Sequence, residues 1–226
     1  MTENLVRAEF HCHTVYSPDS LVRLEDLLAA CRKKGIDRIA ITDHNRIEGA
    51  FKAREMDPGR VITAEEIETT QGEILGYFMN KEIPSGLKPM DVVERLKAQG
   101  AFISVAHPFD PNRGGRWEPG ELEAILPYLD AIEVFNARCI HKSYNEKALQ
   151  FANLHSKGKM AGSDAHSTFE LGRAFLCLPA FETANQLRQS LKQAEFEGKL
   201  SGSYVHLFSA YAKARKKALG QIPSQD

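Results

Sequence analysis

Short runs of apolar, mostly β-branched residues alternate along the chain with longer stretches whose apolar residues recur at helical spacing. Apolar residues recur at every second position in a half-buried strand and at every third or fourth position in a helix, so the two patterns can be told apart. The short runs predict strands at 5–11, 38–42, 61–68, 73–79, 101–106, 131–135, 159–162 and 174–178. The longer stretches predict helices at 24–34, 48–56, 89–99, 121–126, 142–155 and 183–195.

This alternation of strands and helices predicts an α/β protein. Gly35 can close the first helix, Pro89 suits the first turn of another, and segment 69–72 joins two strands as a hairpin. Roughly seven βα units fit a chain of this size. Because the polar residues collect at the strand ends, we expect a (β/α) barrel rather than an open doubly wound sheet.

The domain organisation predicted from composition is simple. The chain has 226 residues, 42% of them hydrophobic, and can bury a substantial core. It contains no stretch that resembles a linker rich in Pro, Gly or Ser, and no internal repeat. We expect one domain over residues 1–226, with a core at about 5–180 and a C-terminal helical extension at about 181–226.

Charge and cysteine usage narrow the class of function. The 29 basic and 30 acidic residues give a net charge of −1, so no global field attracts nucleic acid or an anionic membrane, and a small substrate fits better. The basic cluster Lys213–Lys217 is predicted to be a solvated helix face. No run approaches the roughly 18 apolar residues of a membrane span, so we expect a cytoplasmic protein, and no protein partner is indicated. The cysteines form no CxxC pair and are predicted to be buried free thiols: Cys12, Cys31, Cys139 and Cys177.

Two pairs of metal-ligand residue types stand at the ends of predicted strands. His11 and His13 end the first strand, and because side chains alternate across a strand, residues i and i+2 point the same way. The two imidazoles would therefore converge on one ion. Asp164 and His166 follow the strand at 159–162 with the same spacing.

Single ligand-type residues follow three other strands. His44, Glu66 and His107 each stand at a C-terminal strand end, and in a parallel barrel that rim is where active sites form. Glu133 lies in an apolar strand, where it is expected to orient a ligand or to pair with Arg138. Asp43 is expected to steer a ligand rather than to bind a metal. The remaining histidines fall outside the pattern: His141, His155 and His206.

A set of imidazoles and carboxylates suits zinc, manganese or iron, whereas calcium would use oxygen ligands alone. A tetrahedral site takes about four ligands, so this set implies two or three ions close together. Clustered metals of this kind serve phosphoryl hydrolysis.

These motifs resemble, in order, those of the PHP family, named for polymerase and histidinol phosphatase. The resemblance runs from about Leu5 to Leu178 and rests on His-Cys-His-Thr, Tyr-Ser-Pro-Asp-Ser, Ile-Thr-Asp-His, Glu-Glu-Ile, Ala-His-Pro-Phe-Asp, Ile-Glu-Val-Phe-Asn-Ala-Arg and Gly-Ser-Asp-Ala-His. It implies a distorted (β/α)7 barrel, here with an additional C-terminal helix, that carries two or three divalent metal ions (Mn, Fe or Zn).

The resemblance also implies a ligand set. It puts four side chains around one ion: His11, His13, Glu66 and Asp164. Glu66 would bridge to a second ion that His107 also holds, and a third ion would take Asp19, His44 and His166. Many members place another histidine where this chain has Glu73, so either Glu73 replaces it or that metal is weaker. Asp19 stands where some members use histidine, which favours manganese or iron.

The sequence thus predicts a hydrolase of phosphoric esters that uses metal-activated water as the nucleophile on a small phosphomonoester, a nucleotide or a short oligonucleotide phosphate. Arg138, Arg113 and Arg116 are candidates to hold the phosphate, because a guanidinium fork matches its oxygens. One alternative is an amidohydrolase, which also begins with HxH on a barrel, but the Asp164 pair and the Asp19 segment argue against it. Another is a catalytically silent metal-binding module, which the nearly complete ligand set disfavours.

Overall fold

The fold was analysed in a computed structural model that describes residues 5–113, 117–118 and 120–221. One nine-stranded sheet forms its centre, in the order β7-β6-β5-β4-β3-β2-β1-β8-β9. The strands are β1 (Leu5–Glu9), β2 (Arg38–Ile41), β3 (Val61–Glu68), β4 (Glu73–Tyr77), β5 (Phe102–Val105), β6 (Ala131–Asn136), β7 (Gly158–Gly162), β8 (Ala174–Pro179) and β9 (Glu195–Gly198).

The sheet curls toward closure. Neighbouring strands are parallel from β1 to β3 and from β5 to β7, and the antiparallel strand β4 lies between these two sets as the predicted hairpin partner of β3. An isolated bridge between Cys12 and Ala165 joins the segments that follow β1 and β7. The antiparallel strands β8 and β9 extend the other side of β1. The predicted α/β class with a barrel-like sheet is confirmed.

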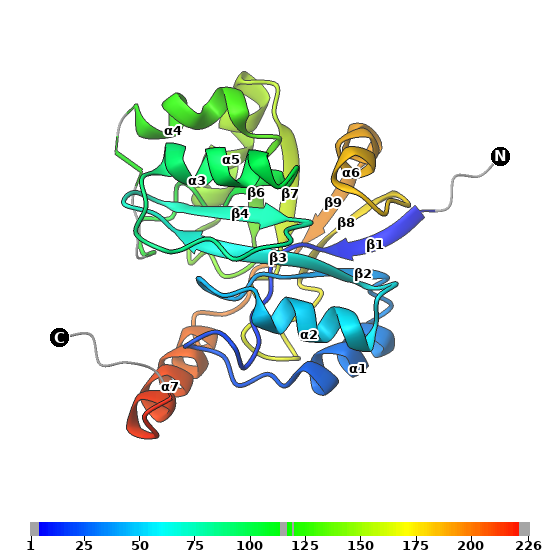
Figure 1. Ribbon diagram of the computed structural model, residues 1–226, viewed down its shortest axis with the longest axis vertical. Helices are drawn as coiled ribbons and strands as arrows, with labels where there is room; N and C mark the ends of the chain where they lie inside the picture. Colours follow the sequence, from blue (N-terminus) through cyan, green and yellow to red (C-terminus); the bar gives the residue numbers. More distant parts are fainter. Residues whose placement is uncertain (1–4, 114–116, 119, 222–226) are drawn as a thin grey trace.

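The helices lie outside this sheet (Figure 1). They are α1 (Leu24–Lys34), α2 (Glu48–Met56), α3 (Pro89–Ala98), α4 (Glu121–Ile125), α5 (Lys142–Leu154), α6 (Ala184–Ser190) and α7 (Val205–Ala218). Within β2, Ile39 and Ile41 join the core cluster shared with the helices, whereas Ala40 joins the cluster inside the curled sheet, as the two-residue period of a strand requires. The inner cluster also holds Phe10 edge-on to Tyr77.

One predicted helix is shorter than expected. The pattern at 183–195 predicts a single helix, but α6 ends at Ser190 and residues Glu195–Gly198 form β9. The half-buried Phe196 stands between exposed Glu195 and Glu197, which is a strand alternation, and β9 pairs with β8. Within the described residues, no helix combines the length and the apolar character that crossing a membrane requires.

Candidate metal centre

The predicted ligands meet at one rim of the sheet because several of them occupy equivalent positions after parallel strands. His11, His107 and Asp164 each lie two residues beyond the last residue of β1, β5 and β7. Glu66 lies near the end of β3. His44 follows β2 and forms an isolated backbone bridge with Glu66. The structure thus brings together all eight predicted ligands: His11, His13, Asp19, His44, Glu66, His107, Asp164 and His166.

Glu66 is the central carboxylate of this cluster. Its Oε2 lies 3.2 Å from His11 Nε2, 3.3 Å from His13 Nε2 and 3.1 Å from His44 Nδ1. Its Oε1 lies 3.2 Å from His107 Nε2. A carboxylate with imidazoles on both oxygens has the arrangement that a bridging metal ligand needs.

Asp164 completes a group with the two histidines of the HxH motif. Its Oδ1 lies 3.1 Å from His13 Nε2 and 3.8 Å from His11 Nε2. Burial favours the protonated acid, but the Arg113 guanidinium and the His11 ring hold the pKa of Asp164 well below its usual range. Asp164 is therefore anionic, as a candidate metal ligand needs to be.

Glu73 lies on the other side of Glu66. Its carboxylate oxygens are 3.4 Å from His107 Nε2 and 3.7 Å from His44 Nδ1. Glu73 begins β4, and because β4 runs antiparallel to β3, the start of β4 lies at the same rim as the end of β3. The structure therefore groups Glu73 with Glu66 and His44.

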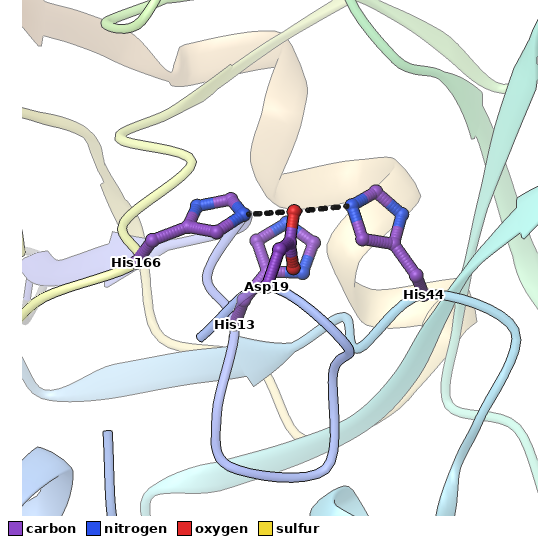
Figure 2. Close-up of side chains that lie close together, drawn as sticks. All are labelled: His13, Asp19, His44 and His166. Atoms are coloured by element: carbon purple, nitrogen blue, oxygen red, sulfur yellow. Dashed lines mark hydrogen bonds and ion pairs between the residues drawn. The ribbon is translucent and has the colours of Figure 1, made fainter. Parts of the chain in front are cut away.

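A third group contains His13, Asp19, His44 and His166 (Figure 2). Asp19 Oδ2 lies 3.0 Å from His166 Nε2 and 3.6 Å from His44 Nε2, so this carboxylate stands between the two rings. His166 Nδ1 donates to the backbone carbonyl of Asp164 at 2.8 Å. That bond leaves the lone pair of His166 Nε2 directed toward Asp19.

The donor set fits divalent transition metals. The buried atoms that make no hydrogen bond within the described part of the chain include three that face the centre of the cluster: His11 Nε2, His13 Nε2 and Glu66 Oε2. Buried polar atoms without partners are rare, and a bound ion would satisfy these. Burial, together with the nearby rings of His166 and His44, lowers the pKa of His13 to about 3, which keeps this imidazole neutral and able to ligate.

Two of these residues have unusual backbone conformations. His107 has a φ of 25° and Asp164 a φ of 53°, both in the left-handed region that residues with a Cβ seldom occupy. Such conformations persist only where the surroundings enforce them, and they cluster at functional sites. Here they aim the two side chains into the rim.

Residues behind the ligands fix their orientation. Glu133 Oε1 accepts from His11 Nδ1 at 2.9 Å, in agreement with an orienting role, and Arg138 does not pair with it. Asp43 accepts from both the backbone N–H and the hydroxyl of Thr14, each at 2.6 Å, and so anchors the loop after His13. Neither carboxylate belongs to a candidate ligand group.

Of the two predicted phosphate-binding arginines that the structure describes, Arg113 borders the cluster and Arg138 does not. Arg113 Nη2 lies 2.6 Å from Asp164 Oδ2, and the Arg113 side chain is 17% exposed. Arg116 lies outside the described residues. The expectation for Arg138 is wrong: this residue is 2% exposed, and its Nη2 donates to Val205 O and Ser209 Oγ of α7, where no substrate phosphate can reach it.

Asn136 contacts the cluster, which the sequence pattern does not predict. Its Nδ2 lies 3.1 Å from Glu133 Oε2 and 3.2 Å from Asp164 Oδ2, so it joins the orienting glutamate to a ligand. In a regular strand, residues 133 and 136 would face opposite sides. A register shift between Glu133 and Phe135 brings them to the same side, and nothing in the residue pattern predicts that bulge.

The fold and the site together define a class: an α/β barrel-like protein whose rim carries clustered imidazole and carboxylate ligands. Family models match the chain in two segments, the PHP domain at residues 9–82 and the PHP-associated segment at residues 142–196. These segments contain every predicted ligand except His107. An uncharacterized protein of Methanocaldococcus jannaschii is 36% identical over 174 residues, which is 76% of this chain and 70% of that protein. The chain therefore belongs to the PHP domain family.

Solved structures agree with the fold. A candidate metal-dependent phosphoesterase from Bifidobacterium adolescentis superposes with a TM-score of 0.62 at 18% identity, over 82% of this chain and 96% of that one. The lesion-specific endonuclease EndoQ from Pyrococcus furiosus gives 0.64 at 16% identity, over 85% of this chain and 57% of that one. At these identities the likeness concerns the fold alone.

Proposed function

We propose that this protein is a metal-dependent phosphoesterase that hydrolyses a small phosphomonoester, a nucleotide or the terminal phosphate of a short oligonucleotide. The observation that carries the proposal is the convergence of His11, His13, Glu66 and Asp164 with two adjoining groups of ligand-type side chains at one rim. Membership of the PHP family and the described activities of two structural neighbours, a candidate phosphoesterase and an endonuclease, agree with it.

The three groups would divide the ions among them. His11, His13 and Asp164 would hold one ion. Glu66 would be shared between this ion and a second ion, which His107 and Glu73 would also hold. The third group is His13, Asp19, His44 and His166. Bound divalent ions would supply Lewis acidity to a phosphoryl oxygen and activate water at neutral pH. Because carboxylates and imidazoles alternate around the centre, manganese, iron and zinc suit it better than calcium.

Arg113 is the residue that we assign to the substrate phosphate. Its guanidinium contacts Asp164 Oδ2 with one nitrogen and lies 3.5 Å from Asp110 Oδ2 with Nε, so its head is held at the edge of the cluster. A planar guanidinium offers paired donors that match phosphate oxygens. It can therefore bind and orient a phosphate that approaches the ions.

A cavity of about 620 Å³ lies between α1 and α7. It supports the proposal that the substrate carries a leaving group of limited size. His166 lines this cavity as well as belonging to the third ligand group, so the cavity adjoins the proposed centre. Its other walls include apolar side chains of α1 and the aromatic rings of Phe208 and Tyr211. Ligand cavities of small molecules fall in this range of volume.

The proposal is tested with a panel of phosphorylated metabolites and short oligonucleotides, assayed for phosphate release with added manganese, iron or zinc. We expect metal-dependent release from at least one class of compound, loss of release with a chelator, and recovery when metal returns. Asp164→Asn should lose metal and lower kcat by orders of magnitude, whereas His155→Ala, outside the cluster, should behave as the wild type. Turnover of amides or lactones without turnover of any phosphoester would refute the proposal.

A further inference from the structure

Lys216 is a buried cation near the C-terminal end of α7. It is 4% exposed, whereas Lys213, Arg215 and Lys217 around it are exposed, so the predicted solvated face at 213–217 is wrong for this one residue. Lys216 shares a helix face with buried Val205 and Ala212. Burying an ammonium group is costly unless its protons find acceptors, so the contacts of Lys216 require an explanation.

Those contacts lie in the loop that carries Asp19. Lys216 Nζ donates to the carbonyl oxygens of Val15 at 2.6 Å and Ser17 at 2.5 Å, and α7 runs beside the loop after β1 (Figure 1). Val15 and Ser17 each lie about 200 positions from Lys216 in the sequence. One ammonium group therefore holds two backbone carbonyls of the loop between the HxH motif and Asp19.

Ser17 transmits this restraint to the ligand. Its hydroxyl donates to Asp19 Oδ1 at 2.8 Å, which leaves Asp19 Oδ2 facing His166 Nε2 and His44 Nε2. The orientation of the Asp19 carboxylate thus depends on Ser17, and the position of Ser17 depends on Lys216. Partners that orient a metal ligand in this way contribute to the affinity for the ion.

The other end of α7 is tied to the same ligand group. Arg138 Nη2 donates to Val205 O at 3.2 Å and to Ser209 Oγ at 2.8 Å, in the first turns of α7. Arg138 Nε lies 3.6 Å from Glu170 Oε1, and Glu170 Oε2 accepts the backbone N–H of His166 at 3.3 Å. Contacts at both ends of α7 therefore lead to Asp19 and His166.

We propose that α7 acts as a clamp on the third ligand group and that Lys216 is a positioning residue for the ion held by His13, Asp19, His44 and His166. This inference rests on the proposed metal centre. In the described part of the chain no hydrogen bond joins α7 to His11, Glu66 or His107. The contacts of α7 lead to Asp19 and His166, which belong to this group alone, so we expect the clamp to act on this ion rather than on the others.

The test compares four full-length chains prepared without metal: wild type, Lys216→Met, Ser17→Ala and the exposed control Lys217→Met. Each is titrated with Mn²⁺, free manganese is followed by electron paramagnetic resonance, and the bound ions are counted by elemental analysis. We expect Lys216→Met and Ser17→Ala to bind one ion about 10–100-fold more weakly and the remaining ions as the wild type does. Lys217→Met should match the wild type, and thermal unfolding without metal gives the folding control.

The outcomes separate this inference from the function proposed above. If the wild type binds no manganese, the proposed centre fails and the clamp fails with it. If the wild type binds two or three ions and hydrolyses a phosphoester, but both variants bind every ion with wild-type affinity or lose all ions together, the clamp alone is refuted. Should Lys216→Met not fold, Ser17→Ala decides, because it leaves α7 and its contacts intact.

Discussion

Glu133 Oε1 accepts a hydrogen bond from His11 Nδ1 at 2.9 Å, while Glu133 Oε2 accepts the backbone N–H of His107 at 2.8 Å. One buried carboxylate thus orients a ligand side chain and holds the backbone of a second ligand. It also fixes the tautomer of His11, whose Nε2 is left to face Glu66 and Asp164.

Replacing Glu133 should weaken the centre without removing a ligand. In Glu133→Gln the amide has a single oxygen, so it cannot accept from both His11 and His107, and we expect metal affinity to fall by about 10–100-fold. A manganese titration measures the change, with the exposed Glu55→Gln as the matched control. Unchanged affinity in Glu133→Gln would show that the hydrogen bond to His11 has no role in metal binding.

Gly162 is required by the close approach of β7 to His11. A Cβ at this position would overlap with the Cβ of His11 and lie 2.9 Å from Glu133 Oε1. We expect Gly162→Ala to lower the free energy of unfolding by about 1–3 kcal/mol and to displace His11, with loss of bound metal. Gly59→Ala, where a Cβ meets open space, is the control. Equal metal content and equal denaturation midpoints in the two variants would contradict this assignment.

Loss of Arg113 should lower catalytic efficiency, whereas loss of Arg138 should lower the stability of the fold. Arg113→Ala removes a partly exposed guanidinium at the cluster. We expect kcat/KM for a phosphoester to fall, with a loss of transition-state stabilisation of about 2–3 kcal/mol, while the protein still folds. Arg138→Ala leaves buried Glu170 without its cation and α7 without its anchor, so the free energy of unfolding should fall by about 3–5 kcal/mol. Steady-state kinetics measures kcat/KM, and urea denaturation measures the free energy of unfolding, on both variants. If Arg138→Ala kept full stability and showed a large rise in KM, Arg138 would bind the phosphate and the structural role assigned to it here would be wrong.

The cavity beside His166 should determine the size of the leaving group. Ala30 of α1 lines it, and a tryptophan there would narrow it. We expect Ala30→Trp to raise KM for phosphoesters with large leaving groups and to leave small ones unaffected. Ala210→Trp, on the exposed side of α7, is the control for the bulk of the added ring. A uniform effect on large and small substrates would exclude the cavity from substrate binding.

The positions of the ligands could be predicted because strand geometry relates them to the sequence. The spacing of His11 to His13 and the placement of His107 and Asp164 directly after apolar runs reflect local periodicity, and the barrel topology brings such strand ends to one rim. The residue pattern leaves the role of Glu73 open, because its place in the cluster depends on the direction of β4. That direction is a property of the hairpin rather than of any single residue.

The residues that support the ligands could not be predicted in the same way. Lys216 belongs to a run of basic residues, and nothing in the run distinguishes the one lysine that faces inward, because its acceptors are backbone carbonyls distant in sequence. The phosphate-binding role predicted for Arg138 is wrong for a related reason: its partners lie on α7, whose position depends on tertiary packing. The strand at Phe196 was hidden because it forms only by pairing with β8.

The central claim is that a cluster of ions held by these ligands performs phosphoester hydrolysis. The most direct measurement is phosphate release from the best substrate of the panel, recorded on metal-free protein as manganese is added and plotted against the number of ions bound per chain. We expect no release from the metal-free protein and a rise in kcat once more than one ion is bound, with a plateau at two or three. Release that is independent of bound metal, or complete after a single ion, would contradict the account.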